Sequence, residues 1–154
     1  MGVWGDWRTR RRLDAERRSE ATRRVARECL LSAPREEIEA VVVQHFRGQG
    51  YEVRHWEFGG RLDLELITDG STVLLQLQNW REIRMGDNRV AAVHRAGIAF
   101  GAVRTILVTG GTFTWLAEQL GGKLGVDLLD GDALLRIAAA QKRTIGAGAP
   151  LRVA

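Results

Sequence analysis

Three polar side chains on two nearby segments of the sequence have types and spacing that could support chemistry. Asp63 lies between two leucines, and Gln76 and Gln78 alternate with leucines further along the chain. Successive side chains of a strand point to opposite faces, so antiparallel pairing of the two segments can bring all three to one sheet face. One carboxylate and two amides would then converge on a polar binding or catalytic site, although a solvated sheet face would use the same residues.

The pairing of these two segments depends on the turn between them. Apolar residues alternate over residues 62–68, and a second strand-like segment covers residues 73–80. Asp69-Gly70 joins the two segments, and an Asp-Gly pair is a strong signal for a two-residue β-hairpin turn. An earlier alternating segment at residues 51–55 adds a third strand. The sequence therefore predicts a three-stranded antiparallel meander that carries the candidate residues.

Segments with helical periodicity surround the predicted meander. A break at Ser32-Ala33-Pro34 and a following apolar repeat predict a helix that ends near Gly48. Downstream, the pattern predicts a helix over 89–100, a strand over 105–109, a helix over 115–120, a strand over 126–129 and a helix over 133–139. We therefore expect an α/β fold in which a mixed β-sheet, an antiparallel meander plus crossover strands, is flanked by helices.

The positive charge of the chain is concentrated at its two ends. The 154 residues suffice for about one domain, and their net charge of +4 comes from 21 arginines and two lysines against 19 acids. Residues 1–35 carry a net charge of +5, residues 36–139 carry −4 and residues 140–154 carry +3. Basic ends could contact the phosphates of nucleic acid, but a solvated arginine-rich helix would have the same composition.

Charge and periodicity together divide the chain into three parts. Residues 1–33 form an arginine-rich extension with a predicted peripheral helix over 13–31, residues 34–139 form the folded domain, and residues 140–154 form a flexible basic tail. One cysteine excludes an internal disulfide, and no run of 18 apolar residues occurs. We therefore expect a cytoplasmic protein with no membrane partner. Homo-oligomerisation through the N-terminal helix is an alternative role for that helix.

Several segments, taken in order, resemble the catalytic domain of Mrr-type restriction endonucleases, which belong to the PD-(D/E)xK nuclease superfamily. They are Gly50-Tyr51, Gly59-Gly60-Arg61-Leu62-Asp63-Leu64, Leu75-Gln76-Leu77-Gln78-Asn79-Trp80, the segment from Ile106 to Thr114, and the segment from Leu128 to Leu134. The resemblance covers approximately residues 34–139. It implies a restriction-endonuclease-like fold and DNA as the partner.

The resemblance assigns roles to individual residues. Asp63 matches the metal-binding aspartate of the family, and Gln76 matches a position where other members of the superfamily carry Asp or Glu. Glu39 matches a helix glutamate that would orient a metal-bound water, although a solvent-facing helix acid is the alternative for this residue. A hard cation such as Mg²⁺ takes oxygen ligands and polarises both a phosphate and an attacking water. The resemblance thus implies phosphodiester hydrolysis with Mg²⁺ held by Asp63 and Gln76.

One departure from the family pattern concerns the catalytic lysine, whose place is taken by Gln78. An amide can position water or phosphate but offers no positive charge to the transition state, a loss that commonly costs about 10²–10³ in rate. Arg61 shares the strand parity of Asp63 and is the candidate replacement cation, while Arg81 and Arg84 are further candidate DNA contacts. A catalytically inactive domain that binds DNA or a protein is therefore the alternative to an active nuclease.

Overall fold

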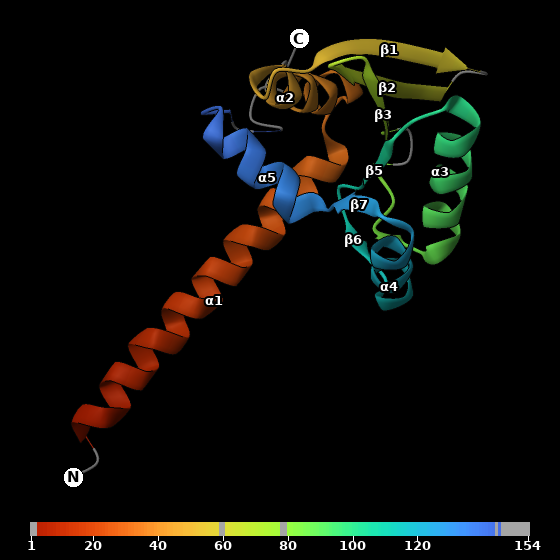
Figure 1. Cartoon of the computed structure of the whole chain (residues 1–154). Coiled ribbons are helices and arrows are strands. Elements are labelled where there is room, and N and C mark those ends of the chain that lie inside the picture. The colour runs from red at the N-terminus through yellow and green to blue at the C-terminus, as the bar shows by residue number, and fades with distance from the viewer. Residues whose placement is uncertain (1–2, 59–60, 78–79, 144, 146–154) are drawn as a thin grey trace.

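A five-stranded mixed sheet forms the centre of the structure, which is a computed structural model that describes residues 3–58, 61–77, 80–143 and 145. The strands lie in the order β1 (Glu52–Phe58), β2 (Arg61–Thr68), β3 (Ser71–Gln76), β5 (Arg104–Val108) and β7 (Val126–Leu129). The first three pair antiparallel, whereas β5 and β7 run parallel to β3. The predicted meander followed by crossover strands is therefore confirmed (Figure 1).

The hairpin between β2 and β3 turns at Asp69-Gly70, as predicted. Both turn residues have positive φ, 48° for Asp69 and 76° for Gly70. A type I′ turn requires this conformation at both central positions, and Asp-Gly adopts it readily. The turn fixes the register of the two strands, so that Asp63 pairs with Gln76.

β3 is shorter than the segment predicted from the sequence. It ends at Gln76, and the chain then turns away from the sheet, with the Trp80 N–H donating to the Leu77 carbonyl at 3.2 Å. Residues 78 and 79 lie outside the described part of the chain, and so does the predicted tail beyond Ile145. The strand therefore delivers Gln76 to the end of the sheet rather than to its middle.

Four helices cover the two faces of the sheet. α2 (Arg35–Gly48) and α5 (Gly131–Ala140) pack on one face, and α3 (Asp87–Phe100) and α4 (Trp115–Leu124) pack on the other. Alternate strand positions supply the two layers, because successive side chains point in opposite directions. Leu64 and Leu75 are fully buried beneath α2 and α5, whereas Leu107 is buried beneath α3 and α4. The predicted helices are therefore all present.

Two of these helices begin at side chains that cap their first turn. The Thr114 hydroxyl accepts a hydrogen bond from the Ala117 N–H at 3.1 Å before α4, and the Asp130 carboxylate accepts one from the Ala133 N–H at 2.9 Å before α5. Such caps satisfy backbone donors that the first turn of a helix leaves without partners.

A second, two-stranded parallel sheet joins β4 (Arg84–Met85) to β6 (Thr112–Phe113). The sequence does not predict these strands, because two residues are too few to show a periodicity. The small sheet links the segment before α3 to the segment before α4, so both lie near the carboxyl ends of β3 and β5.

α1 (Val3–Ser32) is a long helix that projects away from the sheet (Figure 1). It begins at Val3, well before the predicted start at Leu13, because the arginine-rich segment has good helix propensity although it lacks an apolar stripe. Its C-terminal part contacts the domain beside α5, where Leu30 is fully buried. Although α1 is long, neither it nor any other helix in the described ranges is apolar enough to cross a membrane.

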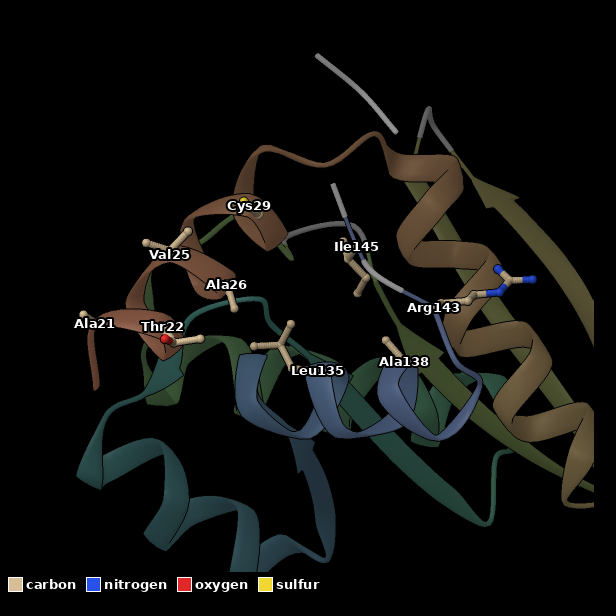
Figure 2. A pocket seen from close by; sticks show the side chains of 9 residues that line it. All are labelled: Ala21, Thr22, Val25, Ala26, Cys29, Leu135, Ala138, Arg143 and Ile145. Carbon is tan, nitrogen blue, oxygen red and sulfur yellow. The ribbon is translucent and has the colours of Figure 1, made fainter. Parts of the chain in front are cut away.

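An apolar groove of about 540 Å³ lies between α1 and α5. Figure 2 shows Val25 and Cys29 of α1 on one side of this groove and Leu135 of α5 on the other, with Ile145 nearby. The groove belongs to the joint between α1 and the domain. None of its lining residues is among the predicted catalytic residues.

An ion pair between Arg27 and Asp132 also fastens α1 to α5, and it leads to a prediction about stability and pH. Two hydrogen bonds, of 2.6 and 3.0 Å, join the guanidinium to the carboxylate, and they lower the pKa of Asp132. The pair therefore stabilises the fold above the ordinary pKa of aspartate, about 4, and this contribution is lost as the pH falls through the lowered pKa. Because the side chains are 41% and 39% exposed, we expect Asp132→Asn to cost at most about 1 kcal/mol.

A double-mutant cycle with Arg27→Gln and Asp132→Asn measures this pair without contributions from other contacts. Urea unfolding at about pH 7 should give a favourable interaction energy between the two side chains, and the energy should be smaller at about pH 3. An interaction energy that does not change between the two pH values would contradict the charge-based explanation.

Candidate active site

A row of four residues crosses the sheet at the level of Asp63. Asp63 in β2 lies directly opposite Gln76, the last residue of β3, and directly opposite Trp56 in β1. Gln76 in turn pairs with Leu107 in β5. Directly opposed residues of paired strands project to the same face. The carboxylate and the amide therefore share one face, as the strand parity predicts.

This row faces the layer formed by α3 and α4. The Trp56 ring packs edge-on against the ring of Phe100 at the end of α3, with centroids 4.3 Å apart and planes at 90°. Leu107 belongs to the buried cluster beneath these two helices. Asp63 and Gln76 thus lie between an aromatic pair on one side and the buried core on the other.

Burial of the Asp63 and Gln76 pair argues against an ordinary solvated sheet face. Gln76 is only 8% exposed, and the Oδ1 atom of the half-buried Asp63 is shielded from solvent. Removing a polar group from water costs free energy that a polar partner must offset. A face that served only to meet solvent would leave these groups in water, so the burial favours a polar site.

Glu65 adds a second carboxylate to this face of the sheet. It follows Asp63 by two positions on β2, is half-buried, and accepts a long hydrogen bond of 3.5 Å from the Thr72 hydroxyl. The alternation Asp-Leu-Glu in the sequence signals this position through strand parity. The resemblance to nucleases assigns roles to Asp63, Gln76 and Glu39 but not to Glu65, and for that reason Glu65 is missing from the predicted site.

Oxygen donors dominate the Asp63 and Gln76 pair, which fits a hard divalent cation. Mg²⁺ is usually bound by one or two carboxylates and completes its shell with water and substrate phosphate. The Asp63 carboxylate and the Gln76 amide oxygen match this pattern. Within residues 3–58, 61–77, 80–143 and 145, no three His, Cys, Asp or Glu side chains gather into a metal cluster. The donor set therefore suits an ion that relies on phosphate for part of its shell.

Glu39 lies on the opposite face of the sheet from Asp63. Its carboxylate on α2 is hydrogen-bonded to the Nε2 atom of His55 in β1. His55 pairs with Leu64, which is buried beneath α2, whereas the next residue, Trp56, pairs with Asp63. The structure therefore brings Asp63 and Gln76 together but does not bring Glu39 to them, because α2 covers the other side of the strands.

Gln78 and the three candidate arginines differ in how the structure describes them. Gln78 and the side chain of Arg61 lie outside the described part of the chain, although the backbone of Arg61 begins β2. Arg81 donates to the Ala33 carbonyl at 3.2 Å and stacks over the Trp80 ring at 4.7 Å. Arg84 is exposed on β4. Arg81 thus supports the joint between α1 and α2, and Arg84 remains accessible to a ligand.

Close backbone contacts hold the segment that follows β3. The Gly110 N–H donates to the Trp80 carbonyl at 2.5 Å, and the Thr112 N–H donates to the Ile83 carbonyl at 2.8 Å. A Cβ atom on Gly111 would collide with the Ile83 backbone, so only glycine permits this approach. The Gly110-Gly111 pair therefore fixes the path of the chain beyond Gln76.

Comparisons with known proteins agree with this architecture. Residues 30–138 match the family model of the Mrr catalytic domain, described as a restriction endonuclease. A search of curated proteins found no match. A solved structure titled "Crystal Structure of Protein of Unknown Function AF1548" superimposes with a TM-score of 0.54 at 12% identity, over 67% of this chain and 66%, just under two thirds, of that one. At this identity the likeness concerns the fold alone. The family match covers most of the chain, which therefore belongs to the Mrr family of restriction endonuclease catalytic domains.

Proposed function

We propose that this protein hydrolyses phosphodiester bonds of DNA in a metal-dependent reaction centred on Asp63 and Gln76. The observation that carries the proposal is the strand register, in which Asp63 lies directly opposite the buried Gln76 at the end of β3. Membership in a family of restriction endonucleases supports a nuclease role for this pair.

In this proposal, the carboxylate of Asp63 and the amide oxygen of Gln76 would hold a divalent ion, with Mg²⁺ as the physiological choice. Restriction-endonuclease-like domains generally use divalent metal ions, and such an ion polarises phosphate and supplies an activated water when bound. Asp63 contributes the negative charge that anchors the ion. Gln78 positions water or phosphate, and Arg61 contributes positive charge near the phosphate. Arg84, exposed near the carboxyl end of β3, contacts the DNA backbone.

A catalytically inactive module that binds DNA through the same face is the second candidate function. The observation that favours it is the glutamine at position 78, where the family carries lysine. The sparse donor set supports it too, since the described residues offer no cluster of three acidic or histidine ligands. The inactive module would retain DNA binding while the chemical step is absent.

A plasmid-nicking assay separates the two functions. We expect the wild-type chain to nick supercoiled DNA slowly with Mg²⁺ or Mn²⁺ and not at all with EDTA. Asp63→Ala should lower the rate by at least about 10²-fold, because the ion loses its charged ligand. The measurement is the rate of conversion of supercoiled to open-circular DNA under single-turnover conditions.

Glu36→Ala provides the matched control, because Glu36 is an exposed acid on α2 remote from Asp63. This variant should nick DNA at the wild-type rate. Binding of DNA by the wild-type chain without any metal-dependent nicking would sink the nuclease proposal and favour the inactive module. Equal rates for wild type and Asp63→Ala would assign any nicking to a contaminant or to another site.

A further inference from the structure

We propose that the projecting part of α1, residues 7–24, is a DNA-binding arm that grips the phosphate backbone of duplex DNA beside the nuclease site. We call this segment the arm. This role of the arm rests on the proposed function, in which duplex DNA is the substrate. The residues that bind the DNA phosphates lie outside the nuclease site.

The arm is accessible along its whole length. Every side chain from Trp7 to Arg24 is exposed, and Figure 1 shows this part of α1 standing clear of the sheet and of the helices that cover it. The contacts that fasten α1 to the domain lie further along the helix, at Arg27 and Leu30. The exposed surface is therefore available to a large ligand.

The charge of the arm selects a polyanion. It contains eight arginines and three acids, a net charge of +5, whereas residues 36–139 carry −4. Arginine binds phosphate through two parallel N–H donors, which lysine cannot do. The eight arginines are Arg8, Arg10, Arg11, Arg12, Arg17, Arg18, Arg23 and Arg24. They outnumber the acids that could neutralise them within the arm.

Local contacts help this exposed helix to persist without a core. Arg12 pairs with Glu16 one turn later at 2.9 Å, and Arg11 stacks over the Trp7 ring at 4.2 Å. Pairs of this spacing stabilise exposed helices. A preformed helix meets DNA with its arginines already arranged, so little ordering accompanies binding.

Self-association fits the arm less well than DNA does. A helix that pairs with a second copy needs a continuous apolar seam, and the large apolar side chains of the arm are only Trp7 and Leu13. Two arms side by side would also bring like net charges together. The apolar groove of Figure 2 lies at the root of α1 and is lined from α1 by residues 21–29, largely beyond the arm.

The C-terminal end of α1, six to seven residues beyond the arm, lies beside the segment that leaves β3. A Cβ on Gly110 would lie 3.2 Å from Leu31 and 3.6 Å from Leu30, and the Gly110 N–H is bonded to Trp80. Trp80 follows Gln76 closely in the chain, so the root of the helix lies near the candidate site. The arm begins about 9 Å further along the helix and is about 27 Å long, the length of roughly eight base pairs.

Salt-dependent binding measures the arm directly. The ligand is a labelled duplex of about 30 base pairs, measured by fluorescence anisotropy with EDTA present so that no cleavage occurs. The test variant changes Arg8, Arg17, Arg18 and Arg24 to Gln in the full chain, and leaves Arg11, Arg12 and the anchoring Arg27 unchanged. The control changes Arg47, Arg95, Lys123 and Lys142 to Gln, four exposed cations outside the arm, and alters the net charge equally.

We expect the arm variant to bind at least about 10-fold more weakly than wild type at moderate salt. Its plot of log affinity against log salt should be shallower by roughly one for each phosphate that the variant no longer neutralises, up to about four. The control should keep the wild-type slope. Circular dichroism of both variants checks that the helix and the fold are retained. Equal losses of affinity in both variants would show an effect of net charge alone and overturn the arm.

The experiments distinguish a failure of the DNA-binding proposal for the arm from a failure of the nuclease proposal. If wild type nicks DNA with metal and the arm variant binds DNA as tightly as wild type, the proposal for the arm is overturned and the nuclease proposal is supported. Loss of affinity in the arm variant without nicking by wild type supports the arm and sinks the nuclease. Tighter binding to an RNA duplex of equal length would overturn DNA as the partner. So would a wild-type dimer in sedimentation experiments that becomes a monomer in the arm variant, if neither protein binds DNA.

Discussion

Replacing Gln78 with lysine is expected to raise the rate of metal-dependent DNA nicking by about 10²–10³-fold. The resemblance to Mrr-type nucleases implies a lysine at this position, and a positive charge there would stabilise the negative charge that develops on the phosphate in the transition state. The amide of Gln78 can orient a water molecule but supplies no charge. The measurement is the single-turnover rate of plasmid nicking at saturating Mg²⁺ for wild type and Gln78→Lys.

Two controls connect that gain to the Asp63 and Gln76 pair. Gln44→Lys adds the same charge at an exposed position of α2 and should leave the rate at the wild-type value. The double variant Asp63→Ala with Gln78→Lys should be inactive, because the introduced cation acts only beside a bound metal ion. Equal and measurable rates for wild type and Gln78→Lys would show that another cation, such as Arg61, already supplies the charge, whereas no nicking by either protein would favour the inactive module.

The hairpin shows how much of the site is predictable from sequence. Asp69-Gly70 determines the turn type and therefore the register, and the register places Asp63 opposite Gln76. Each step is local, because a two-residue turn fixes the register and strand alternation then fixes the face of every side chain. The sequence therefore predicts that Asp63 and Gln76 lie on the same face of the sheet, and the structure agrees.

Which helix covers that face does not follow from local patterns. Glu39 lies on a well-predicted helix, yet α2 packs on the side of His55 and Leu64 rather than on the side of Trp56 and Asp63. Both faces of the sheet are covered by amphipathic helices, so periodicity alone does not tell which layer a given helix joins. A long-range choice of this kind depends on the packing of the whole domain.

The start of α1 and the small parallel sheet were unpredictable for different reasons. The helix extends to Val3 through residues that form no apolar stripe, and hydrophobic periodicity is the main helix signal. β4 and β6 have two residues each and arise where Ile83 and Thr112 meet at the Gly110-Gly111 bend. Tertiary contacts, rather than propensity, create such short strands.

Gln76→Glu is expected to make the stability of the protein depend on divalent metal. The change places a second carboxylate directly opposite Asp63 at a position that is only 8% exposed. A buried carboxylate opposite the half-buried Asp63, without an ion between them, should destabilise the fold by about 2–4 kcal/mol near neutral pH. A divalent ion that binds between them offsets this cost, by about 2.7 kcal/mol when its concentration is 100 times its Kd.

Urea unfolding with EDTA and with increasing Mn²⁺ measures this effect without reference to activity. Gln44→Glu is the matched control, because it introduces the same carboxylate at an exposed position and should change stability by less than about 0.5 kcal/mol, with or without metal. Protonation should also relieve the repulsion, so the Gln76→Glu deficit should shrink as the pH falls below about 5.

The two halves of that result bear on different claims. A deficit that metal does not relieve would show that Asp63 and position 76 are close but do not share an ion, and the metal site would have to be sought elsewhere on the sheet. Absence of any deficit would mean that position 76 is more open to water than its 8% exposure indicates. A loss of stability in Gln76→Glu that both Mn²⁺ and acid relieve would support a metal site at this pair. The wild-type site has one carboxylate fewer than the variant, and this result would hold whether or not Gln78 permits DNA cleavage.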